Sequence, residues 1–172
     1  MHAGAVLQEL ELAELDHGNG SAGSTILSSE AALIFEDLIA RYPDRTSEKL
    51  KTLVDAGKAL NATDYLAAKA FQERMRNALT DALAGFDAVV TLPAFGEAPL
   101  GLDWTGDAEY CAPWTLLGAP AVSLPAGRGQ HGLPLGIQIV GPYRQDLRTL
   151  RVAKWAESTL KFAIGIAEVG SA

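Results

Sequence analysis

The spacing of hydrophobic and polar positions changes near residue 86. Before that point, apolar residues recur every three or four positions, which is typical of helices that bury one face. Pro43 ends the first of these patterns, and Gly85 is a suitable C-terminal cap for the last. Gly57 is expected to bend or break the helix that contains it. The pattern predicts three helices, over residues 28–42, 47–60 and 63–84.

After residue 86 the pattern is that of short strands. The run from Phe86 to Leu92 is rich in strand-forming residues and is closed by Pro93. Glycine and proline mark residues 93–106 as a loop. The remaining predicted elements are a short helix or turn at 110–117, strands at 121–124 and 135–140, and an amphipathic helix at 145–162. These elements predict an α/β fold with a mixed β-sheet flanked by helices.

The first 27 residues are ambiguous. Val6, Leu10 and Leu12 alternate with polar residues as in a half-buried strand, although the same run is rich in good helix formers. Because the run is short, we favour a strand at 5–12, followed by a loop at 17–24. We therefore expect one partial domain over residues 1–172. Its expected parts are strand and loop at 1–27, helices at 28–85, and sheet core with a C-terminal helix at 86–172.

Composition and charge exclude several classes of function. The chain has 172 residues, of which 48% are hydrophobic and 20% charged, as in globular domains. Its net charge of −7 and the lack of a basic block argue against nucleic-acid binding. No apolar run is long enough for a membrane span, and no signal peptide is evident, so we expect a cytoplasmic protein. One cysteine and three scattered histidines predict no disulfide, metal or cofactor.

Three short motifs resemble functional sites but lack the surrounding residues that such sites need. Residues 127–132 spell GxGxxG, yet a strand pattern follows where a dinucleotide site needs a helix, so a turn between strands is favoured. Cys111 and His131 have no spacing typical of a thiol nucleophile and its base. Ser21 lies in a segment that approaches GxSxG, with Asn19 in place of the first glycine. The residues alone therefore show no recognisable catalytic set.

The stretch from residue 110 to 150 closely resembles the C-terminal region of amidase signature enzymes. It contains LxGxPAxSxPAG at 116–127, a variable turn, and GLPxGxQxVG at 132–141. The resemblance extends over nearly the whole chain, and its glycine and proline pattern is specific at 115–141. It implies the C-terminal part of the amidase signature fold. It also implies a parent reaction of amide hydrolysis or ammonia transfer, as in the amidase-type subunit of glutamyl-tRNA amidotransferase.

The resemblance also implies what this sequence lacks. Family enzymes use a Ser nucleophile, a second Ser and a Lys base, all in an N-terminal half that has no counterpart here. No catalytic residue is therefore assigned, and the segment is expected to be inactive alone. The alternative is a stand-alone binding or subunit module derived from an amidase. Whether this chain is itself an enzyme stays open at this point.

The same resemblance implies binding and structural residues. Trp114 and Thr115 are expected to line part of the substrate pocket. The structural motif consists of Gly118, Pro120, Pro125, Gly127, Gly136, Gln138 and Gly141. Gln138 alternates with Ile137 and Ile139, so a buried position would require it to hold a neighbouring backbone. Expected partners are a missing N-terminal half, a partner chain or a second copy, with a small amide as the parent's substrate.

Overall fold

The computed structural model describes residues 4–11 and 13–162. The chain divides into two compact units. The helical unit comprises residues 11–79, and the sheet unit comprises residues 1–10 together with 80–172. The sequence also predicts a fraying tail after Ala163, and that prediction lies outside the described residues. The assignment of one domain to residues 1–172 stays a prediction.

The helical unit contains the three expected helices. They are α1 (Ala13–Arg41), α2 (Glu48–Lys58) and α3 (Ala62–Ala82), with the short 3-10 helix η1 (Pro43–Arg45) after α1. Two of the starts are capped by side chains. The Ser47 hydroxyl accepts a hydrogen bond from the backbone N–H of Leu50, and Asn61 Oδ1 accepts one from Asp64. The predicted helices at 47–60 and 63–84 are therefore confirmed to within two residues.

The prediction that Gly57 breaks its helix is wrong. Residues 48–58 form one uninterrupted helix, and Gly57 is buried within it. A Cβ at Gly57 would lie 1.9 Å from the backbone oxygen of Ser28 and 2.9 Å from Cβ of Ala32. This glycine therefore allows α2 to approach α1 closely. The core of the contact contains Ala31, Ala32 and Val54, with Phe35, Ile39, Leu50 and Leu53 packed around it.

The predictions for the first 27 residues are also wrong. Residues 5–11 form no strand, and position 12 lies outside the described residues. The expected loop at 17–24 is part of α1, which begins at Ala13. Helix propensity bears on the second difference only: Ala, Glu and Leu open α1 at 13–15, and each glycine inside a helix costs only about 1 kcal/mol. Residues 5–11 form neither helix nor strand. The exposed side chains of Val6 and Leu7 show no buried strand face.

The sheet unit contains a three-stranded sheet in the order β1-β3-β2. Its strands are β1 (Val89–Thr91), β2 (Ala121–Arg128) and β3 (Pro134–Val140), so all three predicted strands are confirmed. β2 is longer than predicted because it continues through Pro125 and a bulge before Gly127. Proline is tolerated there because β2 is an edge strand. Both pairings are antiparallel, so the sheet formed by the described strands contains no parallel pair.

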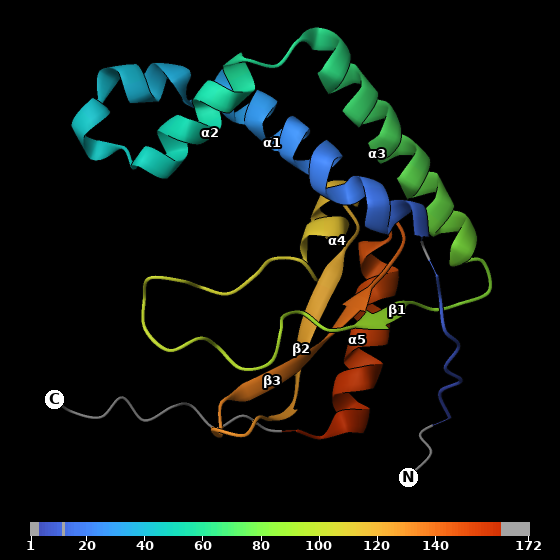
Figure 1. The fold of residues 1–172 in the computed structure, drawn as a ribbon. Helices are drawn as coiled ribbons and strands as arrows, with labels where there is room; N and C mark the ends of the chain where they lie inside the picture. Colours follow the sequence, from blue (N-terminus) through green and yellow to red (C-terminus); the bar gives the residue numbers. More distant parts are fainter. Residues whose placement is uncertain (1–3, 12, 163–172) are drawn as a thin grey trace, which may run out of the picture. The chain divides into compact units, whose positions relative to one another are not determined.

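Helix α5 (Asp146–Leu160) packs against β2 and β3 (Figure 1) and confirms the predicted C-terminal helix. Its contact with the sheet forms the core of this unit, which contains Leu124, Ile139, Ala153 and Ala156. The short helix α4 (Ala112–Leu117) precedes β2 and ends at Gly118, whose φ of 61° is left-handed. The architecture agrees with the expected helix-and-sheet fold.

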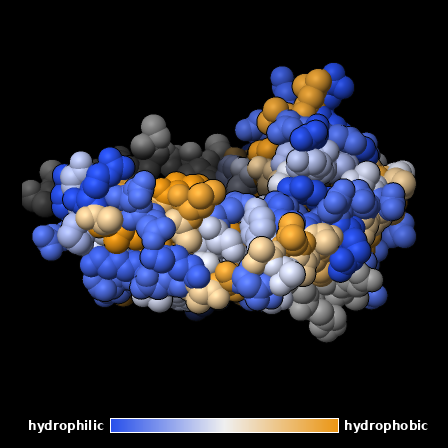
Figure 2. Space-filling model, turned by 90° about the horizontal axis from the view of Figure 1, so that it is seen from above, coloured by the Kyte–Doolittle hydropathy of each residue, from blue (hydrophilic) through white to orange (hydrophobic). Residues whose placement is uncertain are grey.

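Apolar side chains also reach the surface in each unit. Leu33 and Ile34 are exposed on α1, and Leu100 and Leu102 are exposed in the loop after β1. Figure 2 shows hydrophobic residues as separate patches among hydrophilic ones. None of the helices in the described part of the chain combines the length and apolar character needed to cross a bilayer.

Candidate functional site

The sheet unit contains an open groove of about 820 Å³. This volume is in the range of small-molecule binding sites. One wall comes from the loop after β1, and the other comes from β2, β3 and the residues that flank them. The lining residues are 92–99 and 104–107 of the loop, 123–125 of β2, and 134–136 of β3.

The base of the groove is tightly packed around Gly136. This residue pairs with Pro125 across the sheet. A Cβ at Gly136 would lie 3.1 Å from Cγ of Pro93 and 3.2 Å from Oγ of Ser123. Glycine at this position therefore lets the loop after β1 cross close to the sheet, which brings the two walls of the groove together.

Glu97 connects the loop wall to the turn between β2 and β3. Its carboxylate accepts hydrogen bonds from the backbone N–H of His131 at 3.0 Å and of Leu133 at 2.8 Å, and Nδ1 of the His131 ring lies 2.7 Å away. The side chain of Glu97 is 12% exposed. Burial raises the pKa of Glu97, but the hydrogen bonds from His131 and Leu133 outweigh it, so the pKa is lowered overall. The groove therefore contains a charged carboxylate that is already paired.

The GxGxxG motif at 127–132 forms the turn that binds this carboxylate. Gly129 N–H donates to the carbonyl of Leu133, and Gly132 N–H donates to the carbonyl of Gly129. A Cβ at Gly129 would lie 2.3 Å from Cγ of Glu97. The prediction of a turn between strands is confirmed. The sequence alone does not identify Glu97 as a site residue, although the glycine-rich turn could have suggested an acidic partner.

Trp114 and Thr115 lie on α4, and neither lines the groove. The Thr115 hydroxyl donates to the carbonyl of Cys111 one helical turn earlier. The indole Nε1 of Trp114 is buried and has no hydrogen-bond partner among the described residues. Their role in a substrate pocket stays a prediction.

Gln138 connects β3 to the segment before α4. Its side chain is buried, and Nε2 donates to the carbonyl of Tyr110 at 3.3 Å. The Sγ of Cys111 lies 3.1 Å from the carbonyl oxygen of Pro93 and 3.7 Å from Oε1 of Gln138. The Phe95 and Tyr110 rings pack with their centroids 4.5 Å apart. These contacts join the start of the groove loop to its end.

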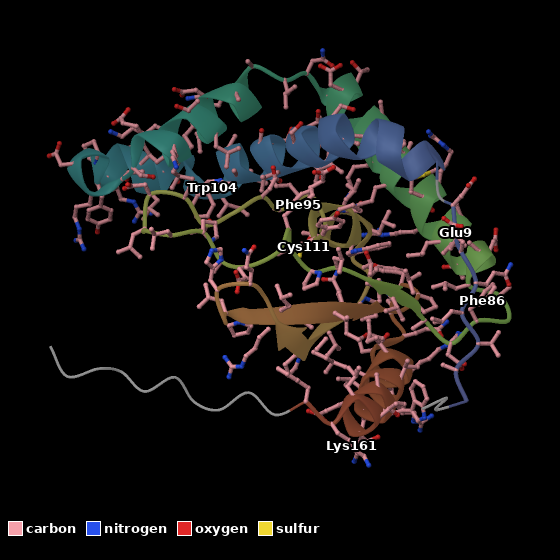
Figure 3. The ribbon with its side chains drawn as sticks, turned by 60° about the horizontal axis from the view of Figure 1, so that its bottom comes forward. Glu9, Phe86, Phe95, Trp104, Cys111 and Lys161 are labelled. Atoms are coloured by element: carbon pink, nitrogen blue, oxygen red, sulfur yellow. The ribbon has the colours of Figure 1, made fainter. Side chains whose placement is uncertain are left out.

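The neighbours of Cys111 do not favour a nucleophile. A thiol needs a base to become reactive, whereas its two contacts here are an amide carbonyl and the side-chain oxygen of Gln138. His131 is bonded to Glu97 instead. Figure 3 shows Cys111 beside Phe95 near α4, with Trp104 further along the loop. Ser21 lies on α1 in the helical unit, so the structure does not gather these candidates into one site in the sheet unit.

The remaining motif residues shape the backbone around the sheet. The carbonyl of Pro120 accepts a hydrogen bond from Gly141 N–H, which joins the start of β2 to the end of β3. A Cβ at Gly141 would lie 1.9 Å from Oγ1 of the buried Thr149 in α5. Gly127 pairs with Leu135 on the far side of the bulge. Among the described residues, no three His, Cys, Asp or Glu side chains are grouped to hold a metal ion.

A family model described as Amidase matches residues 2–150. The chain belongs to the amidase family. It is 28% identical over 150 residues to a fatty acid amide hydrolase of Medicago truncatula, a match that covers 80% of this chain and 24% of the relative. It is 32% identical over 104 residues to a subunit of the glutamyl-tRNA(Gln) amidotransferase of Agathobacter rectalis, covering 55% of this chain and 20% of the relative. The chain thus spans about a quarter or less of these amidase-family relatives.

Solved amidase structures agree with this assignment. A crystal structure of an amidase superposes with a TM-score of 0.78 at 29% identity, covering 90% of this chain and 38% of that chain. The structure of 6-aminohexanoate cyclic dimer hydrolase with substrate superposes with a TM-score of 0.67 at 19% identity, which shows the fold alone. The resemblance drawn from residues 110–150 and the partial amidase fold are therefore confirmed.

Proposed function

We propose that this chain is the C-terminal segment of an amide-hydrolysing enzyme and that it does not hydrolyse amides by itself. The proposal rests on the small share of its relatives' length that this chain covers. The amidase match takes in most of this chain, whereas the chain spans only 24% of the curated fatty acid amide hydrolase and 38% of the solved amidase. The Ser pair and Lys that the family resemblance calls for have no counterpart in this sequence.

In this proposal the chain supplies scaffold and one side of the substrate site. The groove is lined largely by apolar residues, which suits the acyl part of a small amide. The nucleophilic Ser and the donors that stabilise the oxyanion come from the remainder of the enzyme. Trp114, with its unpartnered buried Nε1, stays a candidate for the substrate pocket.

The exposed apolar face of α1 supports a covering partner. Leu27, Ile34 and Leu38 recur at helical spacing and are all exposed. A helix normally buries an apolar face of this kind against another part of the protein. We propose that the remainder of the same enzyme, or a partner chain that replaces it, provides this cover.

The first experiment tests the purified chain for ammonia release from amides that range from acetamide to a long-chain fatty amide. An intact amidase-family enzyme serves as the positive control. We expect no turnover above the blank and no labelling by a fluorophosphonate serine probe. Turnover that the probe abolishes would overturn the proposal that the chain is inactive alone. The Cys111→Ala variant then separates a thiol reaction from a serine reaction.

A second measurement separates the segment from a stand-alone module. The protein is immunoprecipitated from its native source and its intact mass is measured. A polypeptide much larger than 18.1 kDa that reacts with the serine probe supports the proposal. An 18.1 kDa chain that co-precipitates with a partner would favour the subunit or binding module instead.

A further inference from the structure

The groove loop is attached to the β2–β3 turn through Glu97. We infer that Glu97 is a latch that positions the loop as a wall of the groove and thereby limits which ligands the groove admits. The latch itself rests on geometry alone. Only the class of ligand, a small amide, rests on the proposed function.

The turn is built as a receptor for a carboxylate. The N–H groups of His131 and Leu133 converge on Glu97, and the His131 ring adds a third contact. Backbone N–H groups that converge in a turn form concave anion-binding sites, and hydrogen bonds to a charged acceptor are stronger than neutral ones. Both carboxylate oxygens of Glu97 are used, so the side chain is held in one orientation.

Gly129 supplies independent evidence that the turn accommodates Glu97. A Cβ on this residue would meet Cγ, Cδ and Oε1 of Glu97 at 2.3–2.6 Å. By contrast, a Cβ on Gly127 in the same hairpin would meet nothing within 4 Å. The space above Gly129 is therefore filled by Glu97 rather than by solvent.

The exposed tip of the loop makes the latch important. Leu100 is 105% exposed and Leu102 is 97% exposed, so these side chains do not pack the tip against the protein. Yet residues 94–99 and 104–107 on either side of the tip line the groove. Because Glu97 lies between the packed Phe95 and the exposed tip, its release would loosen that part of the wall and widen the groove.

Hydrogen exchange measured by NMR tests the latch directly in the intact chain at pH 7. Glu97→Gln removes the charge, and Gly129→Ala displaces the carboxylate from the other side. We expect the N–H groups of His131 and Leu133 to exchange about tenfold faster in both variants. The matched controls are Glu109→Gln, an exposed acidic residue of the same loop region, and Gly127→Ala. Unchanged exchange at both N–H groups in Glu97→Gln would overturn the latch.

Binding of hexanamide, followed by NMR shifts of groove residues, tests the consequence for the groove. We expect the two latch variants to bind hexanamide several-fold more weakly than the two controls. Faster exchange with unchanged affinity would overturn the role of Glu97 in shaping the groove. Failure of the unsubstituted chain to bind hexanamide would overturn the ligand class, which belongs to the proposed function, while the exchange data still decide the latch.

Discussion

One glycine in each unit makes room for a neighbour of a different kind. In the helical unit, Gly57 removes a side chain so that two backbones can approach, and the contact is otherwise apolar. In the sheet unit, Gly129 removes a side chain so that a charged carboxylate can enter a turn. The first arrangement stabilises by close packing and the second by directed hydrogen bonds. Added volume at Gly57 should therefore disrupt the packing of the helices. The hydrogen bonds of Glu97 should instead respond to a change in its charge or in pH.

The largest expected effect follows from filling the helix contact. Gly57→Ala places a Cβ 1.9 Å from the Ser28 backbone oxygen, and backbone cannot rotate away as a side chain can. We expect a loss of about 3 kcal/mol in the free energy of unfolding. Urea denaturation followed by circular dichroism at 222 nm measures it. Gly23→Ala on α1, where a Cβ meets nothing within 4 Å, is the control. Equal stability of Gly57→Ala and the control would contradict the packing role.

A smaller effect is expected where the obstacle is a side chain. Gly141→Ala places a Cβ 1.9 Å from Oγ1 of Thr149, which is buried in α5. We expect a loss of about 2 kcal/mol, because the clash forces α5 or the Thr149 side chain to shift. Thr149→Ala removes the hydroxyl, so the double variant should recover part of the loss. A double-mutant cycle measures this coupling, and strict additivity would show that the two residues do not meet.

The smallest expected effect is the dependence of the Glu97 latch on pH. The pKa of Glu97 is lowered from its ordinary value of 4.5, so the latch stabilises fully above that value and is lost as pH falls through the lowered pKa. The other titratable or charged groups of the turn are His131 and Arg128, whose Nη1 donates to the Gly132 carbonyl.

The 13C shift of the Glu97 carboxyl, titrated in the folded chain and in urea, measures this shift. We expect the lower midpoint in the folded chain. A folded midpoint at or above the urea value would show that burial, not hydrogen bonding, dominates around Glu97. The Gly129→Ala variant should move the midpoint back toward its value in urea.

Local signals predicted most of the sheet unit. Pro93 and the alternation at 135–140 mark β1 and β3 correctly, and the strand predicted at 121–124 is the first half of β2. The prediction at 5–11 failed because alternation over a few residues is a weak signal, and none of the described strands pairs with this run.

The candidate site was less predictable than the fold. Glu97 and His131 are 34 residues apart, and only the pairing of β2 with β3 brings the turn to the loop. Gly57 was interpreted as a helix breaker because sequence shows conformational cost but not the neighbour that requires a missing Cβ.

The turn at residues 127–132 already holds the Glu97 carboxylate, and this has a consequence for carboxylic acids in solution. A group tethered to the same chain acts at an effective concentration that is about millimolar for a short flexible connection. A free carboxylate below that concentration competes poorly for the N–H groups of His131 and Leu133. Under the proposed function, a carboxylic acid product would therefore find this turn already filled by Glu97.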